Sequence, residues 1–248
     1  APTLQRVNSL LGIAQPFGGL TAQLTDRAGL RRLGRLAREI QSQPNLGARY
    51  QGIVELIPTH LRRRLWTQEA QRSFSVVSAD TEFTNVWERF GGLSDLDRMR
   101  ATDIATYLPG DLLTKVDIAS MSCSLEVRSP FLDQEVMALA AQLPREALIR
   151  RGASKWILRQ FAYSLVPKHL VDRPKSGFGI PQAAWLRGPL RDMTRDLLLD
   201  NTAQQRGWFE LSVIRKMLDI HDSGRDQDRY IWPLLMIEIW ARRWVDQK

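Results

Sequence analysis

Cysteine and histidine are scarce in this chain of 248 residues. Cys123 is the only cysteine, which excludes an intrachain disulfide. Its neighbours are small or apolar, and a reactive thiol needs a nearby cation, so we expect Cys123 to be a packed residue. The three histidines, His60, His169 and His221, are far apart and have no cysteine beside them. A zinc or iron site is therefore not expected, and we assign no metal ligands.

Long hydrophobic runs are also missing. The strongest run, Ile231–Ile239, contains Pro233 and Glu238, whereas a bilayer span needs roughly 18 uncharged apolar residues. Residues 1–11 lack the basic start and the apolar run of a signal peptide. The chain begins with alanine, so either an initiator methionine was removed or the chain is part of something longer. We expect a cytoplasmic location.

Acidic residues are rare in the first third of the chain. The net charge is +8, and residues 1–72 hold 11 arginines against 4 acids. Four arginines at helical spacing form one cationic stripe: Arg27, Arg31, Arg35 and Arg38. No nucleic-acid reader motif accompanies the stripe, so we expect a solvated face or a face toward a missing partner, and no nucleic-acid partner.

Apolar residues recur three and four positions apart along most of the chain, which predicts a mainly α-helical protein. No alternating pattern predicts a strand. Leu96, Met99 and Ile104 are expected to face inward, and Pro109-Gly110 is expected to form a turn. Five residues are expected to cap helix N-termini: Thr81, Ser94, Asp111, Asp133 and Ser154.

The segment Arg173–Pro181 combines two prolines, two glycines and a lysine. The prolines lack backbone donors and the glycines allow backbone angles closed to other residues, so the segment is neither helix interior nor central strand. We expect a mobile loop that brings Arg173 and Lys175 onto an anionic ligand. The alternative is a basic surface loop between two helices.

Lysine is rare beside arginine, with 6 lysines among 35 basic residues. A lysine retained in such a chain suggests a use for its compact charge. Lys155 and Arg159 form an i, i+4 pair at an expected helix start, where a cation opposes the helix dipole and a bound anion would remove the conflict. We expect a phosphate near Ser154, Lys155 and Arg159. The alternative is a solvent-facing helix start whose apolar residues pack inward.

Two other features have structural explanations. Glu126, Arg128 and Asp133 surround a short connection in an apolar neighbourhood, which favours an ion pair joining one helix to the next. The chain has no S-G-G-x-D-S phosphate loop and no G-x-x-x-x-G-K-[ST] motif. Gly91–Asp95 looks similar to the first motif, but the residues before it indicate a helix rather than a buried strand.

From about Asp103 onward, several segments match one family in a single register: Tyr107–Asp117, Ala119–Met121, Ser124–Asp133, Lys155, Ile157–Arg159, Arg173–Pro181, Trp185-Leu186, Trp232, Leu234, Leu235, Glu238 and Trp240. Over roughly 140 residues the sequence thus resembles the glutamine-dependent asparagine synthetases. Residues 1–100 match only in helical character and form a basic helical segment. The resemblance implies that residues 101–248 are the mainly α-helical C-terminal portion of an ATP-pyrophosphatase-type (adenine nucleotide α-hydrolase-like) α/β synthetase domain.

The resemblance also implies a reaction. In the family, Mg-ATP adenylates the side-chain carboxylate of aspartate and releases pyrophosphate. Ammonia from glutamine, made in a separate glutaminase domain, then displaces AMP to give asparagine. Carried over, Lys175 is the catalytic residue that stabilises charge on the phosphates, and four residues are expected to bind the nucleotide: Lys155, Arg159, Arg173 and Gly177. ATP and Mg are the expected cofactors, and a homodimer is an option for the full enzyme.

The sequence departs from the family pattern in several places. It lacks the N-terminal nucleophilic cysteine of the glutaminase domain, the phosphate loop and an acidic S-G-E-G-x-D-E loop. Ile118 stands where many members carry arginine. We therefore expect this polypeptide alone not to make asparagine. The alternatives are a related amide-forming ligase that makes a β-lactam, a peptide macrocycle or an amidated surface sugar, and a non-catalytic helical binding remnant.

Overall fold

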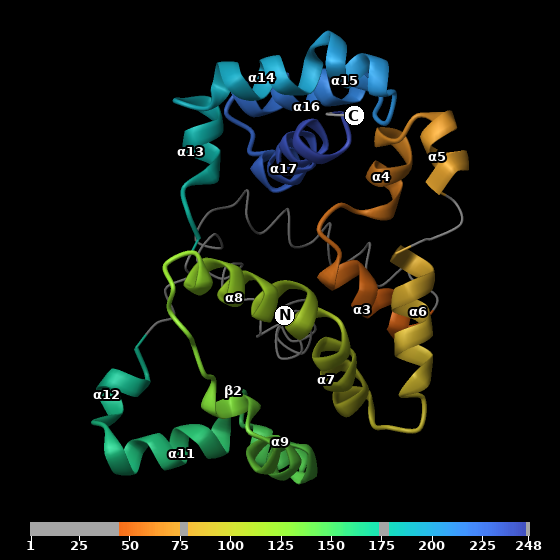
Figure 1. The fold of residues 1–248 in the computed structure, drawn as a ribbon. Coiled ribbons are helices and arrows are strands. Elements are labelled where there is room, and N and C mark those ends of the chain that lie inside the picture. Colours follow the sequence, from red (N-terminus) through yellow and green to blue (C-terminus); the bar gives the residue numbers. More distant parts are fainter. Residues whose placement is uncertain (1–44, 75–78, 174–178, 247–248) are drawn as a thin grey trace, which may run out of the picture. The chain divides into compact units, whose positions relative to one another are not determined.

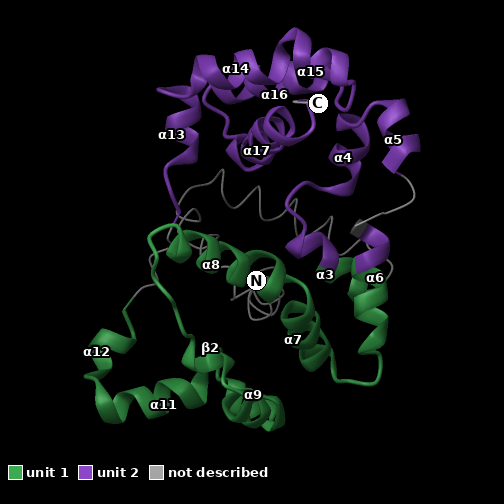
Figure 2. Ribbon diagram, in the orientation of Figure 1, with its two compact units in different colours: residues 1–50, 83–177 green, residues 51–82, 178–248 purple. Residues whose placement is uncertain are grey.

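The computed structural model describes residues 45–74, 79–173 and 179–246 (Figure 1). Helices dominate these residues, which confirms the mainly α-helical prediction. The described part of the chain also holds one hairpin, in which β1 (Ile149–Arg150) pairs antiparallel with β2 (Ala153–Ser154). The predicted arginine stripe from Arg27 to Arg38 lies outside the described residues. The chain divides into two compact units (Figure 2).

Unit 1 comprises residues 1–50 and 83–177. Two helices, α3 (Leu46–Val54) and α6 (Ala79–Arg89), cross the division between the units. The other helices of unit 1 are short: α7 (Asp95–Ala105), π-helical η2 (Leu108–Leu113), α8 (Thr114–Met121), 3₁₀-helical η3 (Pro130–Leu132), α9 (Gln134–Gln142), α10 (Arg145–Leu148), α11 (Trp156–Leu165) and α12 (Lys168–Val171).

A small aromatic core lies in unit 1. The rings of Tyr50 and Trp87 have centroids 5.7 Å apart, and Phe83 lies 6.3 Å from each. The guanidinium of Arg98 lies 4.4 Å from the centroid of Trp87. The Tyr50 hydroxyl donates to the Asp103 carboxylate over 2.6 Å, and burial raises the pKa of both groups. Burial of these rings supplies hydrophobic stabilisation to the helices α3, α6 and α7.

Gly47→Ala is expected to destabilise the protein by about 1–3 kcal/mol. A Cβ at Gly47 would lie 2.6 Å from Nε1 of Trp87, so the buried indole would have to move. Gly52→Ala in the same helix is the matched control, because its Cβ meets nothing within 4 Å. Higher helix propensity should make Gly52→Ala stabilising by about 0.5–1 kcal/mol. Urea unfolding measures both, and equal stability of the two variants would contradict close packing at Gly47.

Unit 2 comprises residues 51–82 and 178–248. Its helices are α4 (Thr59–Leu65), α5 (Gln68–Phe74), α13 (Gln182–Arg187), α14 (Arg191–Leu199), α15 (Asn201–Arg206), α16 (Leu211–Asp222) and α17 (Asp228–Trp244). Nine side chains form its apolar core: Leu65, Leu186, Leu198, Ile214, Met217, Leu218, Ile231, Leu234 and Leu235. Helix α17 lies against α14 and α16 (Figure 1). It continues through Pro233. Burial of its apolar face offsets the hydrogen bond that this proline removes.

A buried ion-pair network holds the end of α15 against α17. Glu238 is 1% exposed and accepts hydrogen bonds from Arg206 and, over 2.7 Å, from Nε of Arg242. Each arginine has a second carboxylate partner, since Arg206 also pairs with Asp246 and Arg242 with Asp200. Glu238, which is among the residues that resemble the last helix of the family, therefore has a clear structural role.

Two of the five predicted caps are confirmed. The Ser94 hydroxyl accepts a hydrogen bond from the N–H of Asp97 at the start of α7. The Asp133 carboxylate accepts from the N–H groups of Glu135 and Val136 at the start of α9. Both residues have extended backbone before a helix, which is the geometry that a short oxygen-bearing side chain needs to reach these donors.

The predictions around Pro109-Gly110 are wrong. The chain does not turn there, because these residues belong to η2, and the N–H of Gly110 donates to the carbonyl of Thr106. Pro109 is tolerated since it stands in the first turn, where its missing N–H needs no partner. Asp111 therefore lies inside a helix and caps none. Thr81 likewise lies inside α6.

Burial in unit 1 also differs from expectation. Met99 is buried as predicted, but Ile104 is 47% exposed. Cys123 is exposed in the turn after α8, so the prediction that it is packed is wrong. Arg128 pairs with Glu126, yet both side chains are largely exposed, so the pair is not buried among apolar residues as predicted. No described helix is long and apolar enough to cross a membrane.

Candidate functional site

The predicted site residues belong to unit 1, and the structure describes three of the five. Lys175 and Gly177 lie outside the described residues, as does most of the Arg173–Pro181 segment. Lys155, Arg159 and Arg173 are described.

Lys155 stands between the hairpin and α11. Arg151 and Gly152 both have positive φ, which is typical of the tight two-residue turn between β1 and β2. Lys155 also has positive φ, at 55°, and is the N-cap of α11. The predicted cap Ser154 is wrong, because Ser154 pairs with Ile149 in the hairpin. The lysine side chain is exposed just ahead of the helix rather than within its first turn.

Arg159 is held at two points of its side chain. Its Nε donates to the carbonyl oxygen of Ser154 over 3.1 Å. Its Nη1 donates to Oδ1 of Asp172 over 2.8 Å. Neither of these two hydrogen bonds uses Nη2 of Arg159, so this nitrogen can offer donors to an anion.

Asp172 collects three partners, and together these form the Asp172 cluster: Arg159, Tyr163, Lys168 and Asp172. The Tyr163 hydroxyl donates to Oδ1 over 2.6 Å, and the Lys168 ammonium lies 3.7 Å from Oδ2. The hydrogen bond from Tyr163, with the nearby cations, holds the pKa of Asp172 below its usual range. The same hydrogen bond raises the pKa of Tyr163.

Sequence reasoning missed Asp172 and Tyr163. Arg159 and Asp172 are 13 residues apart and belong to different helical segments, so helical spacing cannot pair them. The i, i+4 spacing of Lys168 and Asp172 is a local sequence pattern that could have pointed to Asp172. Arg173, directly after Asp172, is exposed and has no ion-pair partner among the described residues.

The alternative to a phosphate site at the start of α11 was a solvent-facing helix start, and the structure agrees with it only in part. It required the apolar residues of the helix to pack inward. Four of them are substantially exposed in the structure: Ile157 (40%), Leu158 (39%), Phe161 (63%) and Leu165 (69%). The helix therefore presents its apolar side to solvent in the described residues.

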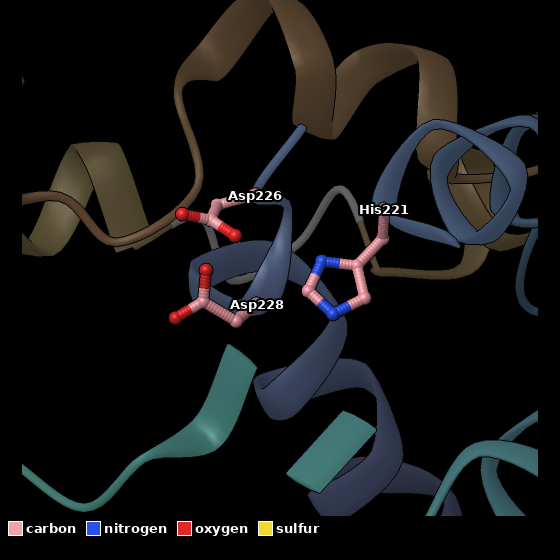
Figure 3. A group of neighbouring side chains, drawn as sticks. All are labelled: His221, Asp226 and Asp228. Carbon is pink, nitrogen blue, oxygen red and sulfur yellow. The ribbon is translucent and has the colours of Figure 1, made fainter. Parts of the chain in front are cut away.

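A second cluster of ionisable side chains lies in unit 2 (Figure 3). His221, Asp226 and Asp228 offer oxygen and nitrogen atoms within 4.8 Å of one another. The imidazole is already engaged, since Nδ1 accepts from the N–H of Gln227 over 3.0 Å and Nε2 lies 3.2 Å from the carbonyl of Ala183. Asp226 and Arg187 form an ion pair. These bonds give His221 a structural role at the end of α16.

Comparison with known proteins identifies the family. A sequence model described as asparagine synthase matches residues 16–242. Glutamine-hydrolyzing asparagine synthetase 1 of Bacillus subtilis (strain 168) is 34% identical over 148 residues, which are 59% of this chain and 23% of the relative. A putative glutamine-hydrolyzing asparagine synthetase of Mycobacterium tuberculosis (strain H37Rv) is 36% identical over 163 residues, 65% of this chain and 25% of the relative.

The glutamine-hydrolyzing asparagine synthetase of Gallus gallus is 31% identical over 147 residues, 53% of this chain and 25% of the relative. The chain thus spans about a quarter of the length of these relatives. No solved structure matches the chain. The family match begins at residue 16, well before residue 101, and the division into residues 1–100 and 101–248 stays a prediction. A match over residues 16–242 covers most of the sequence, and the chain belongs to the asparagine synthase family.

Proposed function

We propose that the chain is part of a glutamine-hydrolysing asparagine synthase. The observation that carries this proposal is the family match over residues 16–242, together with relatives whose names give that activity. The carboxylate of aspartate attacks the α-phosphorus of ATP, and pyrophosphate leaves. Ammonia then attacks the activated carboxyl carbon, and AMP leaves as asparagine forms. The cytoplasmic location and the homodimer stay predictions.

In this proposal Lys175 is the catalytic residue, and Lys155, Arg159, Arg173 and Gly177 contact the nucleotide. The described residues fit a phosphate group: Lys155 and Arg173 are exposed, and the bonds of Arg159 to Ser154 and Asp172 do not use Nη2. A group of cations suits the oxygens of a triphosphate. ATP would supply the adenylyl group that activates the carboxylate.

The same residues do not fit a magnesium site. Mg²⁺ takes oxygen ligands, often from one or two carboxylates. Asp172 is the carboxylate beside these cations, and its oxygens already face Arg159, Tyr163 and Lys168. Mg²⁺ is therefore not assigned to these residues.

We also propose that this polypeptide alone is inactive. None of the side chains from 103 to 173, all of them described, is buried. Large apolar side chains are exposed along this stretch, among them Ile118 (65%) and Phe131 (64%). Exposed apolar surface of this extent is typical of an interaction surface. The chain also spans only about a quarter of its relatives, which include the glutamine-hydrolysing function in their names.

Aspartate-dependent exchange of labelled pyrophosphate into ATP tests both proposals. We expect no exchange with the isolated 248 residues. We expect exchange when the chain is produced with the in-frame sequence encoded directly upstream. Exchange by the isolated chain would show that the fragment proposal is wrong. Exchange that depends on a different carboxylic acid would favour the related amide-forming ligase, and no exchange in either form would favour the non-catalytic remnant.

A further inference from the structure

The Asp172 cluster links the backbone neighbours of two predicted nucleotide-binding residues. Arg159 bonds through Nε to the carbonyl of Ser154, which directly precedes Lys155. Through Nη1 it pairs with Asp172, which directly precedes Arg173. One rigid guanidinium plane therefore ties together the two points from which Lys155 and Arg173 extend.

Two further contacts fix the carboxylate itself. Tyr163 donates from α11 and Lys168 approaches from α12, so Asp172 is held from both helices. The N–H of Asp172 also donates to the carbonyl of Lys168 over 2.9 Å, at the C-terminal end of α12. Three side-chain partners and one backbone bond leave this residue little freedom to move.

We infer that Asp172 is a positioning residue that sets the separation of Lys155 and Arg173. Its carboxylate holds Arg159, and through Arg159 it holds the hairpin end next to Lys155. The inference rests on the proposed function, in which these two cations contact the phosphates of ATP. It assigns to Asp172 no contact with the substrate.

The chemistry of the cluster is suited to this role. Arg159 and Asp172 are partly exposed, with side-chain exposures of 29% and 36%, so a single pair of this kind is weak. A carboxylate with three partners is fixed more firmly than one with a single partner, because each added contact restricts the same group. Without Asp172, the Arg159 side chain and the chain leading into Arg173 are free to separate.

Limited trypsin digestion of the whole chain tests the inference. Trypsin cleaves after lysine, and the bond after Lys175 follows the cluster by three residues, whereas the bond after Arg173 is protected by Pro174. The rate of cleavage after Lys175 is measured by mass spectrometry. Cleavage after Lys216, on α16 of unit 2, reports unfolding elsewhere in the same sample.

Asp172→Asn should increase cleavage after Lys175 about fivefold and leave cleavage after Lys216 unchanged. Asp172→Glu keeps the carboxylate and should restore a rate near that of the unmodified chain. Tyr163→Phe removes one donor and should give a smaller increase of about twofold. The matched control is Asp219→Asn, which breaks the 2.9 Å pair with Arg195 in unit 2 and should not change cleavage after Lys175.

Two results would overturn the inference. One is a rate after Lys175 in Asp172→Asn that equals the rate in Asp219→Asn. The other is a parallel increase after Lys175 and Lys216, which would indicate general destabilisation. The assay needs no catalysis, so its outcome is independent of the pyrophosphate exchange that tests the proposed function.

Discussion

Lys175→Ala is expected to abolish aspartate-dependent ATP–pyrophosphate exchange in the polypeptide that carries the complete synthetase, while glutamine hydrolysis continues. Attack of a carboxylate on the α-phosphate gathers negative charge on the phosphate oxygens. An ammonium group held there, away from bulk water, offsets that charge as it develops. Loss of such a group should raise the barrier by about 3 kcal/mol, which lowers the rate roughly a hundredfold or more.

The two activities separate a chemical effect from a folding defect. Glutamine hydrolysis belongs to a different domain in the family, so it should survive a change that acts only on the phosphates. Lys216→Ala is the matched control, because it removes an exposed lysine from α16 of unit 2. It should leave both activities unchanged. Equal loss of exchange and hydrolysis in Lys175→Ala would indicate misfolding and would remove the support for a catalytic Lys175.

A conservative variant sharpens this test. Lys175→Arg keeps the charge but replaces a compact ammonium on a flexible stem with a planar guanidinium. If Lys175 acts as a point charge against the phosphates, Lys175→Arg should retain more exchange activity than Lys175→Ala but less than the unmodified enzyme. Identical exchange rates in all three proteins would mean that the segment acts without this side chain.

The sequence predicts the helices well, but it predicts only some of their N-caps correctly. Asp133 and Ser94 were identifiable because an N-cap depends on one side chain and the two or three residues after it. Ser154 looked like a cap by the same rule, yet it is paired in a hairpin whose turn requires positive φ at Arg151. A two-residue strand has too few positions to show an alternating pattern, so the sequence alone could not reveal it.

The candidate site was predictable only in part, for a similar reason. The pair of Lys155 and Arg159 was predicted from an i, i+4 spacing, although Lys155 is the N-cap of α11 and lies outside the helix. Their relation to Asp172 depends on how α11 and α12 pack, since Arg159 and Asp172 are 13 residues apart. Tertiary contacts of this kind leave no periodic signal. The prediction that Ile104 faces inward is wrong for the same reason, because the exposure of its side chain depends on which neighbours cover α7.

Glu238→Ala is expected to give the largest loss of stability, about 3 kcal/mol or more. The Glu238 side chain is 2% exposed and bonds to Arg206 and Arg242, whose side chains are 7% and 27% exposed. Removal of Glu238 leaves Arg206 paired only with Asp246 and Arg242 paired only with Asp200. The cost is mainly that the buried guanidinium N–H groups that faced Glu238 lose their acceptor, because an arginine cannot give up its proton. Urea unfolding of the whole chain measures the change.

Asp246→Ala is the matched control for the same network. Asp246 pairs with Arg206 as Glu238 does, but its side chain is 26% exposed rather than 2%. Water can replace much of that interaction, so the expected loss is only about 1 kcal/mol. Glu238→Gln should lie between the two, since it keeps an acceptor oxygen and loses the charge. Equal losses of stability in Glu238→Ala and Asp246→Ala would mean that burial does not set the strength of this ion-pair network. The packing of α15 against α17 would then depend on the apolar core alone.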